Sequence, residues 1–175
     1  AATSGGRICK VTPCPADAVY WDELVKPFAL QMAVIQKEEG SSGGAAIDLE
    51  FYTGELTGGF TYGEGENGCF CDDCFGEFLK RNGTAFAPEK FPPESRWRYL
   101  QEKQQYGEYL KHLAGRVEAR TTAIRETVHA VKPDFVFAVL PAGDGWYFDG
   151  LARGFGTPDI PMLLFSEAEY FSGWN

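Results

Sequence analysis

The sequence predicts an α/β fold in which parallel strands form a partial or complete (β/α)8 barrel of the TIM type. Short apolar runs typical of buried strands alternate with longer stretches of helical periodicity, which is the order expected of a parallel sheet. Acidic residues follow the ends of three of these runs, where β/α barrels place their functional side chains. Residues 1–175 form one segment with about four strands, too few to close an eight-stranded barrel. We therefore expect a part of a longer enzyme, or an incomplete barrel that associates as a homo-oligomer.

Four apolar runs define the expected strands. The first ends within residues 7–12, and the second spans residues 45–52 and alternates poorly, as a strand buried on both faces does. Residues 135–140 form the third run, which is continuous and rich in strand-favouring residues, and residues 161–165 form the fourth. No loop between these runs has the glycine spacing of a phosphate-binding fingerprint, which disfavours a nucleotide-binding sheet.

Helical stretches separate these runs. Asp17 is the expected N-cap of the first helix, which continues to a Gly/Ser linker and which Pro27 is expected to kink. A short helix is predicted at residues 71–81, a long one at residues 95–131 and another short one at residues 147–155.

The composition limits the classes of partner. Hydrophobic residues make up 44% and charged residues 23% of the chain, which is typical of a globular domain. A net charge of −9 argues against a nucleic acid or an anionic membrane as a partner, because both attract basic surfaces. No apolar run approaches the roughly 20 residues that a membrane-spanning helix needs. No signal peptide is evident, so the compartment, cytoplasmic or secreted, is left open.

Three of the five cysteines, Cys69, Cys71 and Cys74, lie within six residues. A disulfide between cysteines this close is strained, so the spacing favours metal ligation, with three reduced cysteines and no metal as the alternative. Structural zinc takes four ligands in a tetrahedron. Cys14 is the favoured fourth ligand, because it also follows an expected strand, and Cys9 is the alternative.

The carboxylates at the expected strand ends are the candidates for catalysis. Asp48 and Glu50 lie on the same side of their strand, since side chains alternate with a period of two. Aromatic neighbours favour the protonated form of Glu50, which suits a general acid. The alternative is that both carboxylates bind loop amides and have no catalytic role. Glu167 ends the last strand and is the second candidate, with the first turn of a helix as its alternative setting.

The cysteine pattern resembles that of a known family. A Cys-Pro turn at Cys14, followed by an acidic strand end and the run from Cys69 to Cys74, is similar to the zinc-containing β-galactosidases of glycoside hydrolase family 42. The resemblance implies that Cys14 and the three clustered cysteines hold structural zinc, and that Glu50 is the general acid/base of a retaining glycosidase. This sequence departs from the family at Leu49, where the family has asparagine, and it stops before the strand that carries the family's nucleophile.

Two functions follow as hypotheses. The first is hydrolysis of a carbohydrate substrate, with Glu50 and Glu167 facing one pocket. The second is a non-catalytic carbohydrate-binding or structural segment that zinc stabilises. The expected substrate-binding residues are carboxylates and aromatic side chains at or near the strand ends: Asp48, Tyr52, Asp144, Trp146 and Tyr170.

Overall fold

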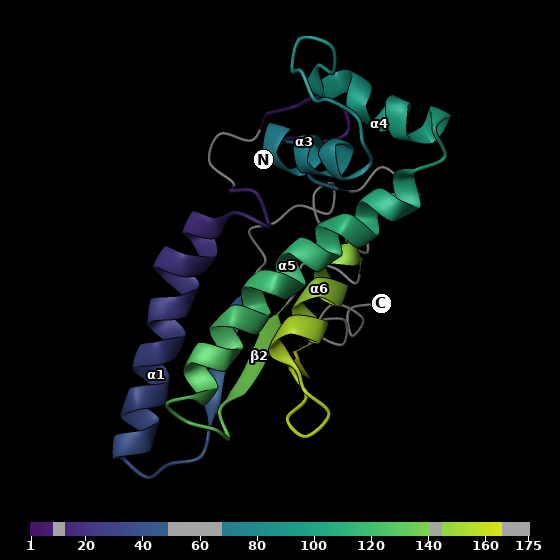
Figure 1. Ribbon diagram of the computed structural model, residues 1–175. Helices are drawn as coiled ribbons and strands as arrows, with labels where there is room; N and C mark the ends of the chain where they lie inside the picture. Colours follow the sequence, from purple (N-terminus) through teal and green to yellow (C-terminus); the bar gives the residue numbers. More distant parts are fainter. Residues whose placement is uncertain (9–12, 49–67, 141–144, 166–175) are drawn as a thin grey trace, which may run out of the picture.

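The computed structural model describes residues 1–8, 13–48, 68–140 and 145–165 as helices packed against a small parallel sheet (Figure 1). The sheet has three strands in the order β1-β2-β3. Their bounds are Gly44–Asp48 for β1, Val136–Leu140 for β2 and Leu163–Leu164 for β3.

The register aligns the carboxyl ends of β1 and β2. The two strands pair in parallel along their whole length, from Gly44 opposite Val136 to Asp48 opposite Leu140. β3 pairs with β2 over only two residues. Burial alternates along β1, where Ala45 and Ile47 are buried while Ala46 and Asp48 are exposed. This alternation indicates that β1 turns one face to the core and the other to solvent.

The predicted (β/α)8 barrel is wrong: the described residues form an open three-stranded sheet. The expected first strand accounts for part of the difference. Residues 9–12 lie outside the described part of the chain, and Ile8 pairs in an isolated antiparallel bridge with Ala2. A tight turn at Gly6, whose φ is +80°, folds this segment back on itself. An apolar run reveals strand propensity but not the partner strand, which is set by contacts distant in the sequence.

The helices follow one another in the predicted order, except that one predicted helix is divided into two. η1 (Tyr20–Val25), a π-helical turn, continues directly into α1 (Lys26–Glu38). Pro27 lies in the first turn of α1, where a missing amide hydrogen is tolerated, and the π turn directly precedes it. The later helices are α3 (Asp72–Arg81), α4 (Pro93–Glu102), α5 (Tyr106–His129) and α6 (Trp146–Phe155).

The long helix predicted over residues 95–131 is in fact two helices, α4 and α5. Gln104 separates them with a φ of +54°, in the left-handed region that ends helices. The amide of Gln105 donates to the carbonyl of Leu100 at 2.8 Å and closes the end of α4. Because left-handed backbone favours glycine or asparagine, a glutamine gives no sequence signal for the break.

Helices α5 and α6 pack closely beside the sheet (Figure 1). Gly150 of α6 faces α5, and a Cβ there would lie 2.6 Å from the carbonyl oxygen of Ala114 and 2.8 Å from the Cβ of Val117. Phe155 of α6 stacks on Phe137 of β2 with ring centroids 4.3 Å apart. Close approach of the two helices therefore depends on the absence of a side chain at residue 150.

We predict that Gly150→Ala lowers the free energy of unfolding by about 1–3 kcal/mol, because the methyl group would overlap backbone and Cβ atoms of α5. Gly115→Ala is the matched control: it lies on α5 with no atom within 4 Å of the new Cβ. The control should be neutral or stabilising by about 0.5–1 kcal/mol, since alanine favours the helix. Urea unfolding curves measure both. A Gly150→Ala protein as stable as the wild type would contradict this account of the contact.

Candidate metal centre

The four cysteines Cys14, Cys69, Cys71 and Cys74 come together beyond the carboxyl ends of the strands. Their sulfur atoms all lie within 4.8 Å of one another, and the sulfurs of Cys14 and Cys74 are 3.4 Å apart. Cys14 therefore joins the clustered cysteines as predicted, while Cys9, the alternative ligand, lies outside the described residues. No disulfide links the four, because all are free thiols.

The start of α3 directs three of the sulfurs inward. Cys71 is the N-cap residue, with extended backbone (φ −66°, ψ 164°), and Cys74 lies in the first turn of the helix. Cys69 precedes them in the adjoining loop and is wholly buried, as is Cys74. A tight change from extended backbone to helix thus turns closely spaced cysteines toward one point.

The Pro13-Cys14-Pro15 turn supplies the fourth sulfur. The amide of Asp17 donates to the carbonyl of Cys14 at 2.8 Å, and the amide of Ala16 lies 3.4 Å from its sulfur. Trp21, wholly buried in η1, donates its indole N–H to the carbonyl of Pro15 at 2.8 Å. The turn is therefore anchored to the core directly after Cys14.

Polar side chains from α4 and α5 hold the loop that carries Cys69. Arg96 of α4, only 1% exposed, donates to the carbonyl of Phe70 and also pairs with Asp72. Tyr109 of α5 donates its hydroxyl to the carbonyl of Cys69. The amide of Phe70 donates to the carbonyl of Ala2 at 2.8 Å. Because these donors come from different elements, the loop is fixed by tertiary contacts rather than by its own secondary structure.

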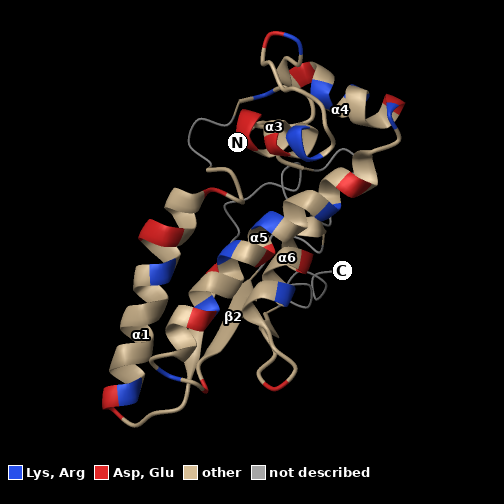
Figure 2. Cartoon of the chain, viewed as in Figure 1, with Lys and Arg blue, Asp and Glu red and all other residues tan. Residues whose placement is uncertain are grey.

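Arg116 of α5 contacts a cysteine sulfur directly. Its Nη1 donates to the sulfur of Cys74 at 3.0 Å, and its Nε lies 3.1 Å from a carboxylate oxygen of Glu77. Burial on its own would lower the pKa of Arg116, but the charges of Cys74 and Glu77 raise it, so the guanidinium stays protonated. The run 116–125 reads from sequence as a solvated helix face, and Figure 2 shows acidic and basic residues interspersed along α5. The missed signal is that Arg116 follows Leu113 by three residues and so lies beside the apolar stripe of the helix.

The four thiols shift one another's pKa values in opposite directions. Hydrogen bonds with Cys69 and Cys71 raise the pKa of Cys14, and hydrogen bonds with Cys14 and Cys69 raise the pKa of Cys74. Hydrogen bonds with Cys14 lower the pKa values of Cys69 and Cys71. Four sulfurs this close, from three buried cysteines and the partly buried Cys71, cannot all carry a negative charge unless a cation compensates it.

The donor set fits a tetrahedral metal ion. A metal with metal–sulfur bonds of about 2.3 Å places its four sulfurs about 3.8 Å apart. The observed sulfurs are separated by 3.4 Å for one pair and by at most 4.8 Å for any pair, so small side-chain adjustments would complete the tetrahedron. All four positions are filled by protein ligands. The arrangement is therefore that of a closed site, which holds an ion without presenting it to a substrate.

Most of the predicted carbohydrate-site residues belong to parts of the chain that the structure does not describe. Glu50, Tyr52, Asp144, Glu167 and Tyr170 lie outside the described residues, so the predicted pairing of Glu50 with Glu167 stays a prediction.

Two predicted substrate-binding residues are described. Asp48 is exposed at the end of β1 and lines a hollow of about 300 Å³ together with Tyr20 and Phe28. Burial and the neighbouring charge of Asp48 raise the pKa of Tyr20 to about 12. Trp146 is 5% exposed at the start of α6, with its ring edge-to-face against Tyr147. The structure therefore places Asp48 at a solvent-facing hollow and Trp146 in the core.

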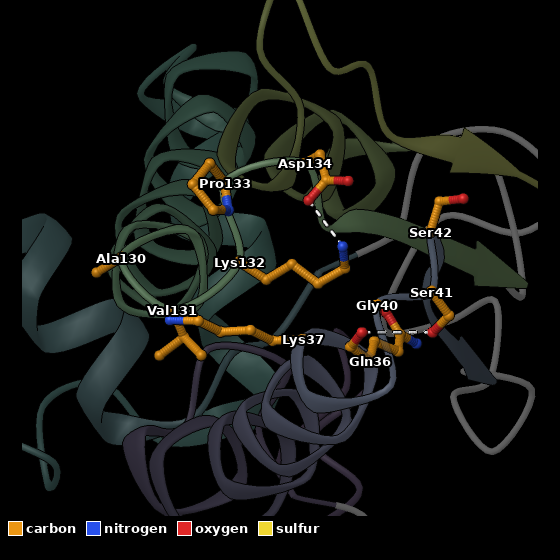
Figure 3. Close-up of a pocket in the computed structure, with 10 residues that line it drawn as sticks. All are labelled: Gln36, Lys37, Gly40, Ser41, Ser42, Ala130, Val131, Lys132, Pro133 and Asp134. Carbon is orange, nitrogen blue, oxygen red and sulfur yellow. Dashed lines mark hydrogen bonds and ion pairs between the residues drawn. The ribbon is translucent and has the colours of Figure 1, made fainter.

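A second hollow, of about 430 Å³, lies at the opposite ends of the strands, between the α1–β1 linker and the α5–β2 turn (Figure 3). Lys132 is 93% buried there, and its ammonium is 2.8 Å from a carboxylate oxygen of Asp134. Ser41 donates to the carbonyl of Gln36 at 3.4 Å. Each of these contacts lies within one of the two connections that precede β1 and β2, and together they account for the polar residues without a ligand.

Comparison with protein-family models, curated proteins and solved structures finds no match to this chain. Among the described residues, none of the helices combines the length and the apolar character needed to cross a bilayer.

We predict that Tyr109→Phe lowers the free energy of unfolding by about 1–3 kcal/mol, because it leaves the carbonyl of Cys69 without its hydroxyl donor in the core. Tyr99→Phe is the matched control, since it keeps the ring contacts with Phe75 and Phe91. Denaturant unfolding of the two variants side by side makes the measurement. Equal stability of both variants would show that the hydroxyl of Tyr109 does not support the loop.

Proposed function

We propose that the chain binds one zinc ion through Cys14, Cys69, Cys71 and Cys74, and that the ion is structural. The observation that carries this proposal is the closed set of four sulfurs within 4.8 Å. Zinc is the metal of choice for a buried tetrahedron of thiolates, since it is redox-inert and imposes no other geometry. Four protein ligands leave no position for a reacting water, which supports a structural rather than a catalytic ion.

The ion would join segments that lie far apart in the sequence. It would tie the turn at Cys14 to the loop at Cys69 and to the first turn of α3. Within the described part of the chain the sheet has three strands, and β3 contributes two paired residues, so this sheet is a small source of stabilisation. Because a structural zinc site forms only when the chain folds, the free energy of zinc binding adds to the free energy of folding.

We predict that the purified protein contains about one zinc per chain and that removal of zinc lowers its melting temperature, because binding energy of a structural ion stabilises the fold directly. Elemental analysis gives the stoichiometry, and thermal unfolding before and after treatment with a chelator gives the effect on stability. Cys14→Ser should lose most of the zinc. Cys9→Ser is the matched control and should retain it. A metal-free protein with unchanged melting temperature would disprove the structural role.

A second proposal concerns the carbohydrate function. We propose that the chain hydrolyses a carbohydrate as a retaining glycoside hydrolase, with Glu50 as general acid/base. The alternative is that it binds a carbohydrate without catalysing a reaction. Two observations support it: the resemblance of the cysteine pattern to family 42, and the hollow beside Asp48. Tyr20 and Phe28 line this hollow, and a carboxylate beside aromatic rings is a combination that suits a sugar, with its hydroxyl groups and apolar ring faces.

We predict that Glu50→Gln lowers the hydrolysis rate of an aryl glycoside by about 10²–10⁴-fold while binding persists, because the amide cannot donate the proton. Glu39→Gln, at an exposed carboxylate outside the proposed site, is the control. Phe28→Ala should instead weaken binding, which calorimetry with the same glycoside measures. Binding by a wild-type protein that does not hydrolyse would favour the non-catalytic alternative. Absence of both binding and hydrolysis would contradict the proposal.

A further inference from the structure

We propose that Arg116 is a positioning residue that sets how tightly the four-cysteine site retains its ion. The proposal rests on the structural zinc proposed above and concerns what controls that site. Arg116 lies on α5, a helix that supplies none of the four cysteines, and reaches across to α3. It would act through the sulfur of Cys74 without contacting the metal.

The geometry fixes the guanidinium between two partners. Its Nη1 donates to the sulfur of Cys74 at 3.0 Å, while its Nε lies 3.1 Å from a carboxylate oxygen of Glu77. Cys74 and Glu77 both belong to α3 and are three residues apart, so they lie on one face of that helix. Two contacts made by different nitrogens of one rigid planar group define its orientation as well as its position.

The positive charge of Arg116 explains why its contact with Cys74 would affect a bound metal. Zinc bound by four thiolates carries a net charge of −2, and Cys74 is wholly buried. A buried negative charge is costly unless it is paired and hydrogen-bonded. Arg116 brings a permanent positive charge and a donated hydrogen bond to one of the four sulfurs, with a side chain only 19% exposed. It therefore offsets part of the negative charge that a bound metal leaves on the sulfur of Cys74.

A purely mechanical role makes a different prediction. If Arg116 only joined α5 to α3 through Glu77, its loss would lower overall stability but would leave the metal–sulfur bonds unchanged. If it acts on Cys74, its loss would weaken the metal–sulfur bond itself. Removal of outer partners of metal ligands typically costs about 10–100-fold in metal affinity.

The test compares Arg116→Gln, Arg116→Lys and the control Arg120→Gln. Arg120 lies one turn further along α5 and pairs with Asp22 at 3.6 Å. Zinc affinity is measured by competition with a chromophoric chelator, and the cobalt-substituted protein reports the sulfur-to-cobalt charge-transfer band. Arg116→Gln should still bind one metal per chain, with an affinity about 10–100-fold lower and a shifted band. Arg116→Lys should fall between it and the wild type, and Arg120→Gln should match the wild type.

Glu77→Gln provides a second variant, which leaves the guanidinium of Arg116 in place and changes a side chain that is 45% exposed. Glu77→Gln should leave Arg116 less well oriented. It should therefore change the zinc affinity and the charge-transfer band in the same direction as Arg116→Gln does, but by less. If Arg116→Gln does not fold, Glu77→Gln tests the role of Arg116 in its place. Affinity and band unchanged in the variants that fold would overturn the role of Arg116 while leaving structural zinc intact. A wild-type protein that binds neither zinc nor cobalt would overturn the zinc proposal and this one with it.

Discussion

The meeting of four cysteine sulfurs is the constraint on which this end of the structure depends. Cys14 and Cys74 are 60 residues apart in the sequence, yet their sulfurs are 3.4 Å apart. Closing a loop of that length costs conformational entropy that short local contacts do not recover. A bound cation would offset this cost with bonds to all four sulfurs at once, and it would also relieve the repulsion between thiolates that are packed together in the core.

The polar groups around the cluster contact either backbone carbonyls near the cysteines or a cysteine sulfur itself. Arg96 binds backbone: it donates to two carbonyls, those of Phe70 and Phe91, while its guanidinium lies 5.5 Å from the ring centre of Phe75. Tyr109 satisfies the carbonyl of Cys69. Arg116 contacts a cysteine sulfur directly, that of Cys74. Because buried carbonyls and sulfurs need partners, the loop that carries Cys69 keeps its shape only when α4 and α5 are docked beside it.

Local patterns in the sequence predicted what is local in the structure. The runs at β1 and β2 and the helix from Asp72 depend on spacing and turn chemistry that neighbouring residues show. Cys14 also joins the cluster as predicted, although that contact is distant in the sequence. Closure of a barrel depends instead on which strands pair, and the segment that contains Ile8 pairs with Ala2 rather than with the sheet. The break at Gln104 was missed because glutamine, which is common in helices, gives no hint of an unusual backbone angle. The contact of Arg116 was missed because arginine is common on solvated helix faces, although its place beside the apolar stripe of α5 was a signal.

Different interactions stabilise the two ends of the fold. Around β2 and α6, stacked rings such as Phe137 and Phe155 and the close contact at Gly150 make an apolar core of the ordinary kind. Around α3 and α4, Phe75 lies at the centre of a group of aromatic rings, directly after Cys74 in the sequence. The rings and the sulfurs therefore share one short helix, α3, whose placement depends on both. Loss of an ion from the cysteines would remove a support of the same helix that organises the aromatic group, so metal binding and core packing at this end are expected to be coupled rather than additive.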